Sequence, residues 1–135
     1  MPRTAADVNE AMQSIWPEVN SRCVDLGPDF AVAEVILGEF RRPGGFIPGP
    51  AQFQAADVAL WYLVFGATGR IEPMALTTEL SIRFLRPGVG EQLFARATLD
   101  RQGRTSVVGT VKVWADDNED RPCSVAQGSY ALPRS

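Results

Sequence analysis

One stretch of the chain, residues 43–69, carries a single charged side chain, Asp57, among apolar and small residues. Its central part has helical spacing and begins with a proline, whose missing N–H is tolerated at the first helical position. We therefore expect a helix over residues 50–65, beginning at Pro50 and ended by Gly66. Because this helix is apolar on nearly all sides, it must be buried on nearly all sides. The rest of the chain has to fold around it.

The two sides of this helix differ in the size of their side chains. Mostly small residues form the side that we expect to pack on the protein's own sheet: Ala51, Ala55, Val58, Ala59 and Tyr62. Larger or polar residues form the side that we expect to contact a second subunit: Phe53, Gln54, Asp57, Leu60, Trp61 and Val64. A lone carboxylate on such a surface is either a structural partner of a neighbouring loop or arginine, or part of a functional site.

The segments around this helix indicate one short helix and a set of strands. Residues 4–16 have an apolar stripe at helical spacing, with Thr4 as N-cap and Pro17 after the end. Two strands, near residues 21–26 and 30–40, come before the central helix, and four in a meander follow it, near 74–87, 91–101, 105–115 and 122–133. Alternation in the first of these four places Thr77 on the face opposite Leu80. Strands without alternating helices favour an antiparallel sheet, and hence a single α+β domain over residues 1–135.

The sequence contains no histidine, which removes several classes of catalyst. Ser-His-Asp and Cys-His mechanisms need an imidazole base, and two cysteines alone cannot complete a zinc site. Cys23 and Cys123 are far apart in the sequence, and we expect both to be small apolar side chains in a reduced compartment. The chemistry would have to use carboxylates, hydroxyls and backbone N–H groups, with no metal ion or redox cofactor.

The charge of the chain bears on its partners. A formal net charge of −3 argues against nucleic acid. No signal-peptide pattern opens the chain and its longest apolar run is too short to span a bilayer, so we expect a cytoplasmic protein without a membrane partner. Residues 80–114 are locally basic, with six basic and two acidic side chains. Solvation explains each of these arginines most simply, and contact with a phosphorylated ligand is the alternative.

Several motifs together resemble the hotdog-fold thioesterases of the phenylacetic-acid-degradation type. Members of this family carry a His-Gly-Gly loop that opens a central helix, and an acidic residue nine positions after the histidine. Pro48-Gly49-Pro50 stands at the loop, and Asp57 stands at the acidic position. The resemblance covers roughly residues 30–133, through ADVALW, LTTELSIRFLRPG, the GR pair at 103–104 and the SYALP end. It implies a hotdog fold, in which a curved antiparallel sheet wraps around one long central helix, here with an added N-terminal helix.

The resemblance also implies an activity and the residues behind it. The chain would be an acyl-CoA thioesterase that hydrolyses an acyl- or aryl-acyl-CoA. Asp57 would activate water or attack the thioester carbonyl, the Gly49 N–H would polarise that carbonyl, and Thr77 would position the water or the carboxylate. Homodimers or homotetramers are implied, with the donor loop and the carboxylate of each site on different subunits. The positions expected to contact substrate are Pro48, Pro50, Gln54, Trp61, Arg83, Arg86 and Arg104.

Two departures from the family pattern bear on turnover. Pro48 carries no polar side chain where the family has histidine, and an asparagine found six residues upstream in some relatives is Arg42 here. Pro50 has no N–H, which leaves Gly49 as the backbone donor of this loop. Two functions therefore stay open: an acyl-CoA thioesterase, and a non-catalytic hotdog protein that binds an acyl-CoA or a similar ligand. Hydratases and dehydratases of this fold need a histidine and are set aside.

Overall fold

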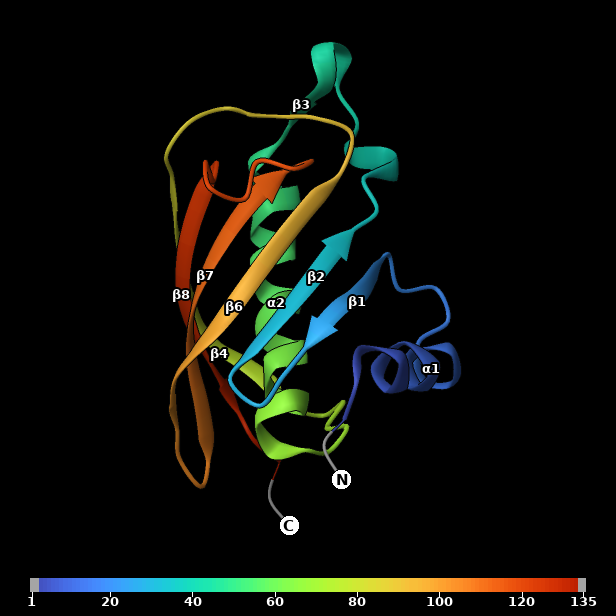
Figure 1. Ribbon diagram of the computed structural model, residues 1–135, viewed down its shortest axis with the longest axis vertical. Coiled ribbons are helices and arrows are strands. Elements are labelled where there is room, and N and C mark those ends of the chain that lie inside the picture. Colours follow the sequence, from blue (N-terminus) through green and yellow to red (C-terminus); the bar gives the residue numbers. More distant parts are fainter. Residues whose placement is uncertain (1–2, 134–135) are drawn as a thin grey trace.

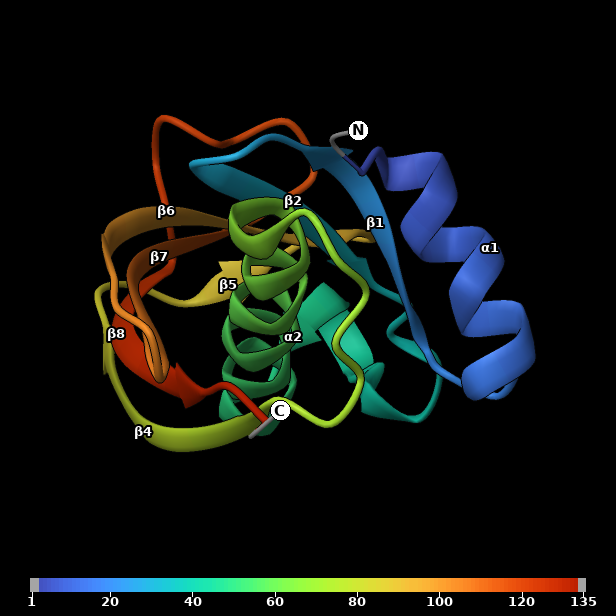
Figure 2. The same ribbon diagram turned by 90° about the horizontal axis from the view of Figure 1, so that it is seen from below.

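A computed structural model describes residues 3–133 of the chain. A six-stranded antiparallel sheet curves around one long helix, α2, while a shorter helix, α1, lies outside the sheet (Figures 1 and 2). The elements are α1 (Ala5–Ile15), β1 (Ser21–Leu26), β2 (Phe30–Val35), β3 (Phe46–Ile47), α2 (Gly49–Thr68), β4 (Leu76–Phe84), β5 (Gly88–Val89), β6 (Leu93–Gln102), β7 (Ser106–Ala115) and β8 (Ser124–Ala131). The predicted α+β layout, a curved antiparallel sheet around a central helix, is confirmed.

The strand order in the sheet is β1-β2-β6-β7-β8-β4. Strands β6, β7 and β8 form a meander as predicted, but the expectation of four strands in a meander was wrong for β4, which pairs with β8 at the far edge. The connection after β4 explains the difference. It contains β5, which pairs with β3 just ahead of α2, and it crosses one end of the molecule before β6 begins (Figure 1).

Small residues on the inner face of the sheet let α2 approach closely. A Cβ atom built on Gly109 of β7 or on Gly128 of β8 would lie 2.8 or 3.0 Å from a methyl group of Leu60. Leu60 and Val64 are therefore buried in the chain's own core, at 1% and 0% exposure. The prediction that these two residues face a second subunit was wrong, because the curved sheet covers more of the helix than one flat face would.

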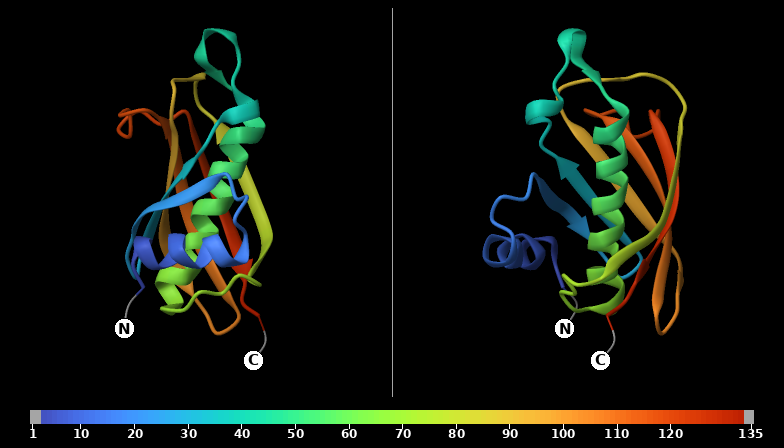
Figure 3. Two further views of the ribbon diagram at one scale, coloured as in Figure 1. Left: turned by 90° about the vertical axis from the view of Figure 1, so that its right-hand side faces the viewer. Right: turned by 180° about the vertical axis from the view of Figure 1, so that it is seen from behind.

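One side of α2 is not covered by any strand of residues 3–133. Seen from behind, the helix lies in front of the sheet along most of its length (Figure 3, right). Phe53 is exposed on this helix, and Gln54, Asp57 and Trp61 are partly buried. No helix within residues 3–133 is long and apolar enough to cross a membrane.

Both ends of α2 differ from the prediction by one to three residues. Pro48 is the N-cap and Gly49 the first helical residue, so Pro50 stands second. The helix passes through Gly66 and ends at Thr68, with Gly69 in the left-handed region at φ 73° and its N–H bonded to the carbonyl oxygen of Phe65. Gly66 serves close packing instead, since a Cβ there would lie 2.2 Å from the carbonyl oxygen of Gly27.

Helix α1 is held against the edge strand β1. Thr4 and Asp7 form a reciprocal capping box at its start, in which the Thr4 hydroxyl accepts from the Asp7 N–H. The hydrogen bond from the Thr4 backbone N–H to the Asp7 carboxylate is the main cause that holds the pKa of Asp7 below its usual value. The Asn9 side chain bonds both the N–H and the carbonyl of Cys23 at 2.8 Å, which docks the helix. Val8 and Met12 are buried as expected. The end of the predicted stripe, which includes Trp16, is about half exposed.

Two predicted strands are altered by local geometry. The strand expected over residues 30–40 stops at Val35, and 3-10 turns follow at Gly38–Phe40 and Pro43–Gly45. In β4, the register with β8 shifts between Thr77 and Glu79, which indicates a bulge. The extra residue places Thr77 on the same, helix-facing side as Leu80. The prediction that these two side chains lie on opposite faces was therefore wrong.

Replacing Gly66 with alanine tests the close contact between α2 and the loop after β1. In an exposed helix this change would stabilise the protein by about 1 kcal/mol. Here we expect Gly66→Ala to lower the free energy of unfolding by about 1–3 kcal/mol, because the new methyl group meets a backbone oxygen. Urea denaturation measures the change. Gly103→Ala is the matched control, because the nearest atom to its Cβ is 3.7 Å away. A stabilised Gly66→Ala variant would contradict the packing.

Candidate active site

The carboxylate of Asp57 lies on α2 between two hydroxyl donors. The Tyr130 hydroxyl lies 2.7 Å from Oδ1 of Asp57 and 3.0 Å from the backbone oxygen of the same residue. The Thr77 hydroxyl donates to Oδ1 at 2.8 Å. Burial raises the pKa of Tyr130 well above its usual value, and the adjacent Asp57 carboxylate raises it further, so the phenol stays protonated and acts as a donor. Within the described chain, Oδ2 of Asp57 has no hydrogen-bond partner.

Neighbouring strands deliver the two donors to the same oxygen. Thr77 of β4 and Tyr130 of β8 are directly paired across the sheet. Tyr130 points inward because β8 alternates, and the inward positions before it are occupied by Ala126 and Gly128. Thr77 points inward because of the bulge in β4. The carboxylate is thus held by the sheet that the helix packs on.

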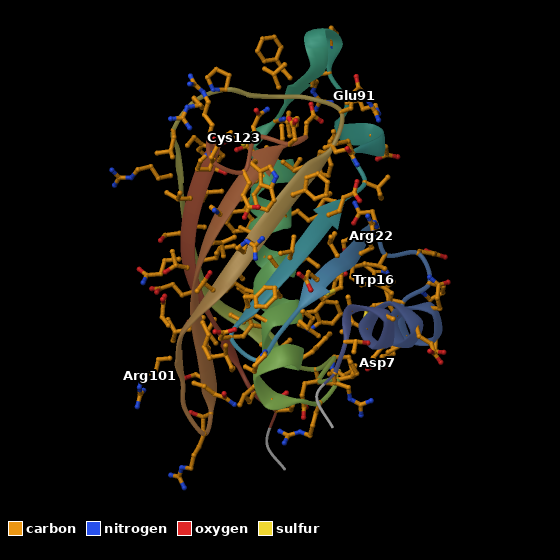
Figure 4. All side chains as sticks on the ribbon, viewed as in Figure 1. Asp7, Trp16, Arg22, Glu91, Arg101 and Cys123 are labelled. Atoms are coloured by element: carbon orange, nitrogen blue, oxygen red, sulfur yellow. The ribbon has the colours of Figure 1, made fainter. Side chains whose placement is uncertain are left out.

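A pocket of about 270 Å³ adjoins this carboxylate. Its walls come from the end of α1, from α2 and from the segment before β4. The apolar lining includes Trp16, Val19, Val58, Trp61 and Leu76, and the polar lining includes Gln54, Asp57, Thr77 and Tyr130. The indole rings of Trp16 and Trp61 meet edge to face, with centroids 6.4 Å apart. Trp16 lies beside α1 and β1 (Figure 4).

Three of the residues predicted from sequence line this pocket together with Asp57. Thr77 contacts the carboxylate directly, as expected. Trp61 forms part of the apolar wall, and Gln54 lies nearby with its side-chain amide bonded to Asn20. The predicted catalytic and binding roles of these residues stay predictions, but their gathering around one carboxylate is what those roles require.

The start of α2 offers one free donor. Of the first four helical positions, Pro50 has no N–H, and the N–H groups of Ala51 and Gln52 bond the Pro48 carbonyl at 3.1 and 3.3 Å. The Gly49 N–H is left without an acceptor among residues 3–133. Partial positive charge collects at a helix start, so this N–H can bind a carbonyl oxygen or an oxyanion. The ring of Phe84 lies close by, 3.2 Å from where a Cβ of Gly49 would be.

The loop Pro48-Gly49-Pro50 does not meet Asp57 within one chain. Gly49 and Asp57 are eight residues apart on one helix, which separates them by about 12 Å along its axis. None of the three loop residues lines the pocket beside Asp57. A single chain therefore holds the carboxylate and the free N–H in two different places.

The three arginines that were predicted to contact substrate lie outside this pocket and apart from one another. Arg83 lies in β4 on a shallow polar surface with Thr110 and Gln127. Arg86 donates to the carbonyl of Pro122, and Arg104 belongs to the turn between β6 and β7. All three are exposed. Their contact with a phosphorylated ligand stays a prediction.

The basic strands are partly neutralised by the acidic loop before β8. Glu119 of this loop pairs with Arg96 at 2.6 Å and with Lys112 at 3.3 Å. Hydrogen bonding to Arg96 is the main cause that holds the pKa of Glu119 below its usual value. This face of the sheet is thus a surface of paired charges.

The cysteines lie away from the pocket, and both are buried and free. Burial raises the pKa of Cys23 to about 12 and that of Cys123 above its usual value, so neither is a ready thiolate. They behave as the small apolar side chains that we expected. Among residues 3–133, no three metal-binding side chains gather at one place.

Comparison with known proteins assigns the chain to a family. Residues 44–121, more than half of the chain, match the sequence profile of the thioesterase superfamily. The chain belongs to the thioesterase superfamily. This membership supports a thioester hydrolase. No curated protein sequence matched the chain.

Several solved structures share the fold of this chain. A candidate thioesterase from Silicibacter sp. superimposes with a TM-score of 0.83 at 26% identity, covering 96% of this chain and 92% of that one. A mutant of a phenylacetic acid degradation protein from Thermus thermophilus gives 0.67 at 17% identity, covering 92% and 99%. A Haemophilus influenzae thioesterase gives 0.78 at 17%, covering 99% and 93%. The hotdog fold is confirmed.

Tyr130 belongs to the Asp57 site but was not among the site residues predicted from the sequence. The signal was present in the spacing of β8, where alternate positions before Tyr130 are small and inward-facing. A tyrosine on such a face is buried and needs a partner for its hydroxyl. Asp57 is the one charged residue on the helix beneath it. The pairing of β4 with β8 brings Thr77 and Tyr130 together, and this pairing could not be predicted from the sequence.

Proposed function

We propose that this protein is an acyl-CoA thioesterase in which Asp57 is the reacting carboxylate. The observation that carries the proposal is the placement of Asp57 beside an apolar pocket that no other charged side chain of residues 3–133 lines. Such a pocket suits an acyl group, and a carboxylate at its wall suits activation of water or direct attack. Membership of the thioesterase superfamily supports the thioester as the bond that is cleaved.

The proposed reaction balances with water as the only co-reactant. Water adds to the thioester carbonyl carbon and gives a proton to the Asp57 carboxylate. The carbon–sulfur bond then breaks, the electron pair leaves with sulfur, and the thiolate takes up that proton. In the alternative route Asp57 attacks the carbonyl first, thiolate leaves, and water hydrolyses the resulting anhydride. Both routes release a carboxylic acid and free coenzyme A.

We propose that a second copy of the chain completes each site, in a homodimer or a homotetramer. One carbonyl group cannot touch both Asp57 and the Gly49 N–H of the same helix, because about 12 Å separates them. Apolar rings surround the Gly49 end of the helix: Phe53 is 41% exposed and Phe84 is 52% exposed. Exposed apolar groups next to a free donor favour a covering subunit. The Gly49 N–H of one copy would then stabilise the oxyanion beside the Asp57 of the other.

A non-catalytic acyl-CoA binding protein is the second candidate. Pro48 presents no polar side chain to the carbonyl, and the Phe84 ring lies beside the start of the helix, 3.2 Å from where a Cβ of Gly49 would be. Both features weaken stabilisation of an oxyanion while leaving the apolar pocket intact. The two candidates differ in whether free thiol is released.

Thiol release from purified protein distinguishes the thioesterase from the non-catalytic binding protein. We expect release from at least one of a set of short, medium, long-chain and aryl acyl-CoAs. Asp57→Asn should lower kcat by about a hundredfold or more, because the amide cannot accept the proton of water. Asp100→Asn is the matched control, since Asp100 also accepts a hydrogen bond from a threonine, Thr110, but lies away from the pocket.

Two results of this assay would contradict the proposal in different ways. No release from any thioester, together with acyl-CoA binding by calorimetry, would make this a binding protein. Equal release by wild type and Asp57→Asn would leave hydrolysis standing and remove Asp57 from it.

Mixed dimers test whether the site is shared between copies. Gly49→Pro removes the N–H at a position where proline suits a helix start, and Pro48 is already extended, as a following proline requires. We expect Gly49→Pro and Asp57→Asn each to be inactive alone. A tandem-tagged heterodimer of the two should recover about half of the wild-type activity, because one of its two sites is intact.

Gly49→Ala controls for crowding, because it adds a Cβ and keeps the N–H. A heterodimer as inactive as its parents would place both groups of a site on one chain and contradict the shared site.

A further inference from the structure

Tyr130 contacts Asp57 at two points. Its hydroxyl oxygen lies 2.7 Å from Oδ1 and 3.0 Å from the backbone oxygen of the same residue. One phenol therefore touches both the side chain and the main chain of Asp57. A group that contacts both fixes the side-chain torsion between them, and so fixes which way the carboxylate faces.

The strand that carries Tyr130 is more firmly held than the strand that carries Thr77. Tyr130 is 5% exposed, and β8 is paired on both sides, with Thr77 of β4 and Val107 of β7 opposite Tyr130. Thr77 is exposed and belongs to the edge strand β4, beside its bulge. A phenol has two side-chain torsions and a rigid ring, so it places its hydroxyl at little entropic cost. Tyr130 is therefore the better anchor of the two donors.

Both donors meet the same carboxylate oxygen. Oδ1 accepts from Tyr130 and from Thr77, while Oδ2 has no partner in the described chain. An oxygen that already accepts two hydrogen bonds has less capacity to accept a proton or to attack carbon. We propose that Tyr130 is a positioning residue that reserves Oδ1 and leaves Oδ2 of Asp57 as the atom that reacts with water or with the thioester.

This inference rests on the proposed function and deepens it. In this role the Tyr130 hydroxyl acts through Asp57, although the residue also forms part of the pocket lining. A structural role is the alternative, in which the hydroxyl of a core tyrosine simply needs a partner. Tyr62 is an example of that structural role, since its buried hydroxyl lies 2.7 Å from the Ser21 hydroxyl and makes no hydrogen bond to Asp57.

The pH dependence of activity separates positioning from structure. The groups that face Asp57 are Thr77 from β4, Tyr130 from β8 and Gln54 and Trp61 from α2, and none of these is charged at neutral pH. Hydrogen bonds from Tyr130 favour the ionised carboxylate. We therefore expect that loss of this donor moves the acid limb of the activity profile to higher pH.

The main experiment compares Tyr130→Phe with Tyr62→Phe in thiol-release assays across pH. For Tyr130→Phe we expect kcat to fall by at least about tenfold, since a hydrogen bond to a charged group is lost, with KM nearly unchanged. The acid limb of its profile should move to higher pH. Tyr62→Phe loses a similar buried hydroxyl that makes no hydrogen bond to Asp57, so it should lower the melting temperature while leaving the acid limb unmoved.

The assays distinguish a failure of the proposed role of Tyr130 from a failure of the proposed thioesterase function. Absence of hydrolysis in the wild type counts against the thioesterase itself. An active wild type with an unchanged Tyr130→Phe overturns only the role of Tyr130. A lower kcat with an unmoved acid limb makes the role structural and also overturns it.

A second measurement needs neither turnover nor a folded Tyr130→Phe variant. The chain has two tyrosines, so fluorotyrosine incorporated into Tyr62→Phe labels position 130 alone. Because the Tyr130 hydroxyl contacts the Asp57 carboxylate, we expect the fluorine resonance at this position to shift on the acid side, and this shift to be lost in Asp57→Asn. A resonance that titrates equally in both proteins, or in neither, would overturn the link between Tyr130 and Asp57.

Discussion

Leu60 of α2 packs into the gaps that two glycines leave on the inner face of the sheet. Methyl groups of Leu60 lie within 3.0 Å of where Cβ atoms of Gly109 and Gly128 would be. Any larger residue at either position would push the helix outward. Because the helix lies this close, the phenol of Tyr130 can reach the main chain of Asp57 as well as its carboxylate. The geometry of the candidate site therefore follows from how the core is packed.

The central helix and its carboxylate were readable from sequence because they depend on local pattern. A long apolar run with one acid, opened by Pro-Gly-Pro, predicts a buried helix with an unusual group on it, and the structure has that helix. Strands such as β1 were found for the same reason, with bounds that match. Alternation and helical spacing are properties of neighbouring residues, and these predictions needed nothing more.

Features that depend on distant contacts were not readable. Gly66 looked like a helix end, but the carbonyl of Gly27 is what requires a glycine there. Thr77 seemed to face away from Leu80 until a bulge in β4 reversed its side. The partner of β4 is β8, and that pairing between residues some fifty positions apart brings Tyr130 to the site. No pattern within either strand indicates the register of the other.

The proposed chemistry divides one site between the middle and the start of α2. Asp57 stands at the middle, held by the sheet, and the free Gly49 N–H stands at the start, where partial positive charge collects. In one chain they cannot act on the same carbonyl. Side by side in two copies, they would supply a carboxylate and an oxyanion donor without histidine or metal. Pro48 then contributes the shape of the helix start and no polar group.

A crystal structure of the Asp57→Asn protein with an intact acyl-CoA would locate the reacting carbonyl group. We expect the thioester carbonyl carbon within about 3.5 Å of the side chain at position 57. The acyl group should lie in the pocket beside Trp16 and Trp61, and the carbonyl oxygen should face the Gly49 N–H of a second copy. A thioester bound away from position 57, with the pocket empty, would contradict the proposed role of Asp57.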